Sequence, residues 1–245
     1  RSVSKRMEQW EELPTRGFPM LFYGLQSICS REMDSPSYYN EAEASKVADL
    51  IEQLLLKGGG GGRAVTTDDI AVVTPFRKQV DKLRLLLRGR GRGQVRVGSV
   101  DDYQGQEENV IFISTVLTRD CRGRKEAGAH SLMSSPQRFN VAITRAKALL
   151  VVVGDPDALL EDASWQQLLR YAVTNKAYRG CPHALCLEGA EDEDESIALS
   201  MAELATQALG AGDMSKMYPS LSRTNEQYHY GLEQEQDDLP WRVVL

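Results

Sequence analysis

The sequence lacks any apolar run of about 18 residues, the length that a membrane-spanning helix needs, so a transmembrane segment is excluded. It also opens without the apolar stretch of a secretory signal peptide and without an initiator methionine, which suggests a fragment. Only four cysteines occur in 245 residues, too few and too scattered for a disulfide framework. We therefore expect a cytoplasmic, reducing environment and no membrane partner. The four cysteines are Cys29, Cys121, Cys181 and Cys186.

Charge is unevenly distributed along the chain. Residues 1–187 carry 26 Lys and Arg against 22 Asp and Glu, whereas residues 188–245 carry 3 against 13. The second part also has few apolar clusters, a composition typical of disorder. We expect a mildly basic body that is able to bind a polyanion, followed by an acidic, largely disordered tail over residues 183–245.

The body alternates short apolar runs with amphipathic stretches of helical period. Strands that are apolar throughout and alternate with helices favour a parallel α/β sheet with helices on both faces. Asn40 is a plausible N-cap of the first helix, with Glu43 as its capping-box partner. The predicted strands cover residues 20–25, 69–74, 95–100, 109–116 and 148–154. The predicted helices run from Asn40 to the glycine run 58–62, across 80–87, over 137–147 and across 165–172.

Three polar segments adjoin these strands, and we expect all three at strand ends, where open α/β sheets place ligands. Thr74-Pro75-Phe76-Arg77 follows a buried strand and suits a phosphate backbone, although on this segment alone a Pro-capped strand exit with a surface arginine is favoured. Residues 97–107 form a polar turn in which Ser99 can bond a phosphate and Glu107 a ribose hydroxyl; a solvated connector is the alternative.

The third segment, residues 137–147, is amphipathic. Its apolar positions pack on the sheet and leave Arg138 and Arg145 on a polar face. Arg145 on a rigid helix is able to reach a transferring phosphate, whereas an isolated helix of this kind more often carries an ordinary basic stripe.

Together and in this order, VVTPFRKQV, VGSVDDYQGQEENVIFISTV and QRFNVAITRAK resemble the fourth, fifth and sixth motifs of superfamily 1 helicases. They are most similar to the branch that includes the nonsense-mediated-decay helicases and the armitage-like, silencing-defective RNA helicases. The entry GFPMLFYG…SPSYYN and the closing NKAYRGC resemble the silencing subgroup. The resemblance covers residues 14–182 and implies a RecA-like fold of the P-loop NTPase type, corresponding to the second of two motor lobes.

The resemblance also implies roles for individual residues. Arg145 would be an arginine finger on the γ-phosphate of ATP, and Glu107 would contact the ribose, with Gln104 and Gly105 shaping the nucleotide cleft. Contacts to the nucleic-acid backbone would come from Thr74, Pro75, Ser99 and, with a less defined role, Arg77.

The departures from the family pattern are equally informative. No G-x-x-x-x-G-K-[ST] phosphate loop, no Asp-Glu pair for Mg²⁺ and no NYR-type segment occurs, so we expect these upstream of Arg1. We identify no metal-ligand set in this chain, and the Mg²⁺ ligands are expected in the first lobe. By itself the chain is expected not to hydrolyse ATP.

We therefore expect a linker over residues 1–19, a motor lobe over 20–182 and the acidic tail over 183–245. The expected function is that of half an ATP-dependent helicase on single-stranded RNA, in RNA silencing or mRNA turnover and in cytoplasmic RNA granules, with partner proteins bound by the tail. Two alternatives stay open: a non-enzymatic adaptor built on a lone lobe, and a lobe of a DNA helicase, because motor motifs grip the backbone without reading the 2′-OH.

Overall fold

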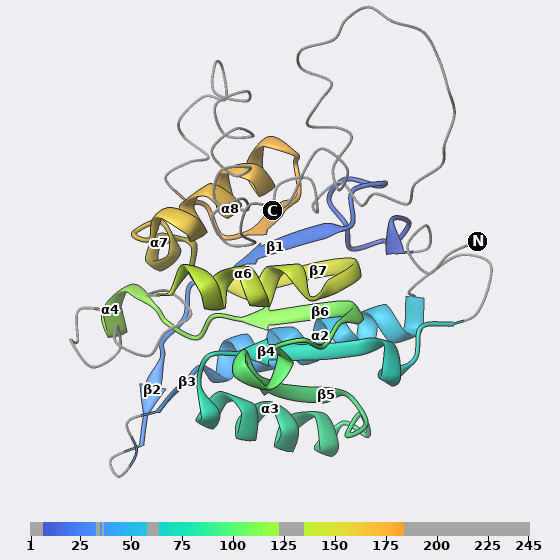
Figure 1. The fold of residues 1–245 in the computed structure, drawn as a ribbon, viewed down its shortest axis with the longest axis horizontal. Helices are drawn as coiled ribbons and strands as arrows, with labels where there is room; N and C mark the ends of the chain where they lie inside the picture. The colour runs from blue at the N-terminus through green and yellow to red at the C-terminus, as the bar shows by residue number, and fades with distance from the viewer. Residues whose placement is uncertain (1–6, 33–34, 36, 58–63, 123–134, 184–245) are drawn as a thin grey trace, which may run out of the picture.

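The computed structural model describes residues 7–32, 35, 37–57, 64–122 and 135–183 (Figure 1). None of the helices in these ranges combines the length and apolar character that a membrane crossing requires. The expected acidic tail from residue 184 onward and the glycine run 58–62 lie outside the described residues.

A six-stranded sheet in the order β5-β4-β6-β7-β1-β8 forms the centre, and every pairing in it is parallel. This confirms the predicted parallel α/β class. Five of its strands match predicted ones, whereas the edge strand β8 was not predicted. The strands are β1 (Met20–Gly24), β4 (Ile70–Thr74), β5 (Arg96–Ser99), β6 (Glu108–Ser114), β7 (Ala146–Gly154) and β8 (Tyr178–Gly180). A separate antiparallel pair joins β2 (Ser30–Arg31) and β3 (Tyr38–Tyr39).

Alternate side chains of each central strand enter two different cores, as the pleat of a β-strand requires. In β4, Val72 joins a core with α2 (Glu41–Lys57) and α3 (Arg77–Gly89), whereas Val73 joins the core on the opposite face. That second core contains residues of α6 (Pro136–Thr144) and α8 (Ala163–Thr174), and Figure 1 shows α6 across the sheet from α2. Covering both faces explains why these strands are apolar throughout.

The predicted helix over 137–147 is too long at its C-terminus. α6 ends at Thr144, Arg145 is its C-cap, and Ala146 already pairs with Glu108 in the sheet. Strand pairing overrides helical periodicity here because Ala146 is buried at the start of β7. The remaining short helices are η1 (Thr67–Asp69), η2 (Asp101–Tyr103), α4 (Arg119–Arg122) and α7 (Pro156–Leu159).

Residues on both flanks of the expected motor lobe pack into its cores. Met7, Trp10 and Leu13, from the stretch expected as a linker, are buried together with α2 and α3. His183, the first residue of the expected tail, is also buried, and its ring lies 4.4 Å from that of Tyr178.

The four cysteines predicted no disulfide framework, yet two of them are paired in the structure. Cys29, just before β2, and Cys121, in α4, form a disulfide with their Cα atoms 6.4 Å apart. Ninety-two positions separate the two residues, and sequence spacing alone carries no information about that approach.

Candidate nucleotide and nucleic-acid site

The residues expected to contact nucleic acid meet at the carboxyl ends of β4 and β5. Thr74 and Ser99 are register partners at the last positions of these strands. Thr74 is fully buried, and no hydrogen-bond partner is present for its hydroxyl in the described part of the chain. Ser99 is partly buried, and its N–H and Oγ both bond one carboxylate oxygen of Asp102, at 2.7 and 2.8 Å.

Pro75 and Arg77 continue this edge from β4 into α3. Pro75 is partly buried, and Phe76 behind it packs edge-on against Tyr38 of β3, with ring centroids 5.6 Å apart. This packing fixes the start of α3, so that Arg77, its first residue, is exposed beside the strand ends.

A buried polar cluster supports the turn that follows β6. Glu43 is fully buried; its Oε2 accepts the N–H of Val116 at 2.8 Å and bonds the hydroxyl of Ser114 at 2.6 Å. Asn40 donates from its side-chain amide to the Val116 carbonyl at 3.3 Å. Both backbone groups of Val116 are therefore held, which stabilises its φ of 71°, an unfavourable value for a β-branched residue.

The capping prediction for α2 is confirmed only in part. Asn40 accepts the N–H of Glu43 at 3.1 Å, as an N-cap should. The predicted reciprocal bond, from the N–H of Asn40 to the Glu43 carboxyl, does not form. The N–H of Asn40 donates to Gln79 at 2.8 Å, and Glu43 binds the β6 turn instead.

The same turn brings two further threonines to this edge. The hydroxyls of Thr115 and Thr118 are buried, with no hydrogen-bond partner among the described residues. A Cβ on Gly154, at the end of β7, would lie 2.1 Å from the Thr115 hydroxyl, so only glycine permits this packing. Counting Thr74, three hydroxyls near the carboxyl edge are buried without a hydrogen-bond partner among the described residues.

The residues expected to contact the nucleotide lie elsewhere. Glu107 immediately precedes β6 and Arg145 immediately precedes β7, so both stand at amino ends of strands. Residues 74–77 and the start of residues 97–107 lie where strands end, as expected, whereas Glu107 and Arg145 lie immediately before strands. The reason is that the η2 segment carries the chain from the end of β5 back to the start of the parallel strand β6.

These amino-end residues are held next to one another by the backbone. The N–H of Glu108 donates to the carbonyl of Arg145 at 3.0 Å, and Lys147 pairs with Glu107 at 3.7 Å. Gly105 in the same loop has a φ of 81°, which favours glycine. Gln104, beside it, is exposed. The loop and the arginine thus share one end of two adjacent strands.

Arg145 is folded back on its own helix. Its Nε donates to the Val141 carbonyl at 3.1 Å and its Nη2 to the Thr144 hydroxyl at 2.8 Å. These bonds satisfy two C-terminal acceptors of α6 and use two of the five guanidinium donors.

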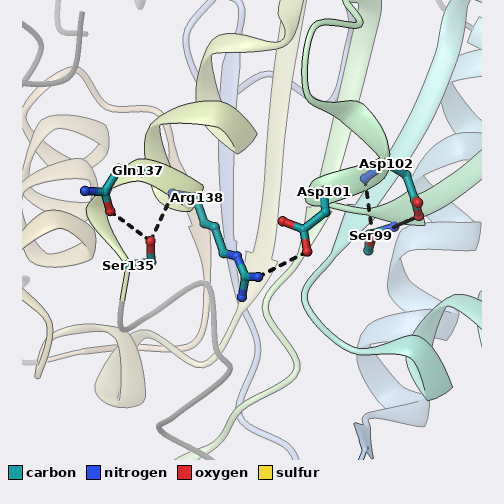
Figure 2. A network of polar contacts seen from close by, with 6 residues as sticks. All are labelled: Ser99, Asp101, Asp102, Ser135, Gln137 and Arg138. Carbon is teal, nitrogen blue, oxygen red and sulfur yellow. Dashed lines mark hydrogen bonds and ion pairs between the residues drawn. The ribbon is translucent and has the colours of Figure 1, made fainter. Parts of the chain in front are cut away.

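An ion pair joins the elements that carry the two groups of residues. Figure 2 shows Arg138, in the first turn of α6, bonded to Asp101 of η2 at 3.1 Å, close to the Ser99–Asp102 contact. The Ser135 hydroxyl caps α6 by accepting the N–H of Arg138 at 3.4 Å. The helix that precedes Arg145 is thereby tied to the turn that follows Ser99.

Two carboxyl groups at the carboxyl ends of the strands have pKa values shifted in opposite directions. Burial raises the pKa of Glu43 to about 8, against the opposing effect of the bonds from Ser114 and Val116, so this carboxyl is mostly protonated at neutral pH. The bonds from Ser99, backbone first, hold the pKa of Asp102 below its usual range, and the nearby Arg77 and Arg84 act in the same direction.

The chemistry of these residues is compatible with a nucleotide. Gly105 permits close backbone approach, Glu107 offers an exposed acceptor for ribose hydroxyls, and Arg145 has donors left for a phosphate. In the described part of the chain, no group of three or more His, Cys, Asp or Glu residues is arranged to hold a metal ion.

The sequence did not reveal the supporting residues. Glu43, Ser114, Gln79 and Thr115 come from segments that are adjacent only in the folded sheet. The available signals were two polar residues, Ser114 and Thr115, directly after an apolar strand run and an acidic residue on the buried face of a helix.

A RecA-like sheet with helicase-type segments on its connections defines the class as a motor-lobe domain. A family model described as an AAA domain matches residues 1–157. The chain belongs to this family, within the superfamily 1 helicases, as the resemblance predicts.

Named relatives agree with this assignment. Over 189 residues the chain is 42% identical to RNA helicase Mov10l1 of Homo sapiens, covering 77% of this chain and 15% of that protein. Over 161 residues it is 35% identical to the Drosophila melanogaster protein named "Probable RNA helicase armi", covering 65% of this chain and 13% of that protein. The chain therefore spans about a seventh of the length of these relatives.

Proposed function

We propose that the chain is the second motor lobe of an ATP-dependent RNA helicase that acts on single-stranded RNA in silencing or mRNA turnover. The observation that carries the proposal is the bond from Glu108 to the Arg145 carbonyl, which keeps the Gln104–Glu107 loop and the arginine at one end of the sheet. Similarity to two proteins named as RNA helicases supports RNA over DNA.

In this proposal the lobe forms half of an ATP cleft, and a first RecA-like lobe supplies the phosphate loop and the Mg²⁺ ligands. ATP supplies the phosphoanhydride bond whose hydrolysis drives the motor. Glu107 orients the ribose, and Arg145 leaves its contacts with Val141 and Thr144 to donate to the γ-phosphate. Pro75, Arg77 and Ser99 hold the RNA backbone at the opposite end of the same sheet, whereas Thr74, which is fully buried, supports the strand end behind them.

The Arg138–Asp101 ion pair gives these two halves a direct connection. Closure on ATP moves α6 relative to the first lobe, and the ion pair passes that movement to the η2 turn beside Ser99. The lobe is proposed to act in the cytoplasm, in RNA granules, with silencing or decay proteins recruited by the acidic tail.

The deciding experiment is to sequence the transcript upstream of Arg1 and to assay the complete encoded protein for ATP hydrolysis. The proposal expects a phosphate loop, an Asp-Glu pair and an NYR-type segment upstream, and ATPase activity that RNA stimulates more than single-stranded DNA does. A protein that binds RNA without hydrolysing ATP is an adaptor, and one stimulated equally by DNA is a general translocase; either result contradicts the proposal.

A further inference from the structure

A basic pocket lies on the outer edge of the sheet, outside the residues assigned above apart from Arg77. It measures about 410 Å³, in the size range of ligand sites. α3 and the edge strand β5 form its walls, and the η2 turn forms its upper end. Its charged lining residues are Arg77, Arg84, Arg88, Arg96 and Asp102.

Three of these arginines form a single stripe on α3. Arg77, Arg84 and Arg88 are seven and four positions apart, so their side chains project from one side of the helix. With a rise of about 1.5 Å per residue, the stripe extends roughly 16 Å along the pocket. Asp81 lies on the same side of α3 but is not among the residues that line the pocket.

The acidic groups nearby leave the pocket positive. The Asp102 carboxylate accepts the N–H and hydroxyl of Ser99 and keeps its charge, so the lining carries four arginines against this one carboxylate. Glu108 pairs with Arg96. Arg84 donates from Nε and Nη2 to the Val97 carbonyl at 3.1 and 2.6 Å, which fixes its guanidinium across the edge of β5 and leaves three of its five donors for a ligand.

This chemistry selects phosphate groups. A guanidinium binds phosphate oxygens in pairs, and a guanidinium that is already anchored loses little freedom on binding. The pocket has no exposed ring for a base, because its aromatic residue, Tyr103, is only 4% exposed. A free nucleotide would leave its base without a stacking partner, whereas a nucleic-acid backbone needs none.

We infer that this pocket binds backbone phosphates of the RNA strand as it passes beyond the strand ends of β4 and β5 and down the edge of the sheet. The pocket is continuous with the strand ends of β4 and β5. Arg77, which lines it, follows Phe76 directly after β4, and Asp102, which also lines it, accepts the hydroxyl of Ser99 at the end of β5. The inference rests on the proposed function, which places RNA at Ser99. It adds a sequence-independent grip at Arg84 and Arg88 that lengthens the RNA footprint of the lobe.

The test measures fluorescence anisotropy of labelled oligouridine with the 245-residue chain over a range of salt concentrations. Arg88→Ala should weaken binding roughly tenfold, the scale of one charge-assisted bond. It should also reduce the slope of log K against log salt by about 0.7 for each phosphate that the variant no longer neutralises. Arg88→Lys should recover part of the affinity. Arg179→Ala, on β8 at the opposite edge, removes the same charge and should leave affinity within twofold of wild type.

A second arm distinguishes the source of the phosphate and separates this inference from the proposed function. Oligouridine, inorganic phosphate and uridine monophosphate are titrated while the amide signals of Gly93 and Gly98 in the pocket are followed by NMR. Displacement of these signals by oligouridine at lower concentration than by either small anion supports the inference. Wild-type affinity and salt slope in Arg88→Ala and in Arg84→Ala/Arg88→Ala overturn it while RNA binding, and the proposed function, stand. If the small anions shift the signals and oligouridine does not, the pocket takes free anions and the inference fails.

Discussion

The two ends of the sheet are built differently. At the carboxyl end, Thr74 is buried and the β6 turn is fixed by Glu43, Asn40 and Gln79, so the surface proposed to face RNA exists before any ligand arrives. At the amino end, Gln104 and Glu107 are exposed and Arg145 rests on its own helix. The carboxyl end is therefore preorganised, whereas the amino end needs a partner surface to complete it. The proposed motor function would need this asymmetry, because a motor holds its track throughout the cycle and closes on ATP only once per step.

The largest effect of a substitution is expected at the amino end of the sheet. In the complete enzyme, Arg145→Ala should lower RNA-stimulated ATP turnover by roughly a thousandfold, because an arginine finger acts on the transition state. Arg145→Lys keeps the charge without the planar guanidinium, so its ATP turnover should lie between that of the wild type and that of the alanine variant. Steady-state phosphate release measures both, and turnover near the wild-type rate in the alanine variant would refute the assignment.

The preorganised carboxyl end should make the stability of the fold depend on pH. The raised pKa of Glu43, about 8 against an ordinary value of 4.5, means that the folded state holds this proton more tightly than the unfolded state does. Stability from this group is complete below about pH 4.5 and is lost as pH rises to about 8, by at most about 1.4 kcal/mol per pH unit. Asp155, whose pKa burial also raises, acts in the same direction.

Glu43→Gln, which stays neutral, should therefore remove most of this pH dependence between about pH 5 and 8. Urea unfolding at several pH values measures it, with Glu41→Gln on the exposed first turn of the same helix as the control. Equal pH slopes in wild type and Glu43→Gln would show that the carboxyl is ionised in the folded state.

The Arg138–Asp101 ion pair should contribute more to the coupling between RNA binding and ATP hydrolysis than to the stability of the fold. Asp101→Asn breaks the contact with Arg138, and because this pair is exposed it should cost less than about 1 kcal/mol of stability. RNA stimulation of the ATPase should nevertheless fall roughly fivefold, the lower range of coupling between sites. The charge swap Asp101→Arg/Arg138→Asp should restore part of the stimulation; unchanged stimulation in Asp101→Asn would mean that another route couples the ends.

The smallest effect is expected at Ser99. Ser99→Ala removes one hydroxyl and should weaken RNA binding about threefold, the scale of one neutral hydrogen bond, without changing ATP affinity. Fluorescence anisotropy with RNA and with a labelled ATP analogue measures the two affinities. Unchanged RNA affinity would show that the Ser99 hydroxyl does not contribute to RNA binding.

The sequence predicts the sheet well because its strands are buried on both faces and therefore apolar throughout, as in Val72 and Val73. It fails where a contact distant in the chain decides the conformation. Ala146 continues a helical pattern yet pairs with Glu108, and Glu43 occupies a capping position yet binds Val116. The motifs identified the candidate residues, but only the topology separates them into two ends of the sheet, because the return of η2 to the start of β6 leaves no periodic pattern.

The Cys29–Cys121 pair has a mechanical consequence for a protein proposed to work under load. When bonded, it closes a ring of chain that contains α2, β4, α3, β5 and β6, with 92 positions between its ends. A pull on the two termini then bypasses that ring, and the fully stretched chain is shorter by roughly 300 Å than when both thiols are reduced. In any reducing compartment the same two residues would stay as thiols. The extensibility of the lobe is then set by its parallel strand pairings rather than by a covalent bond.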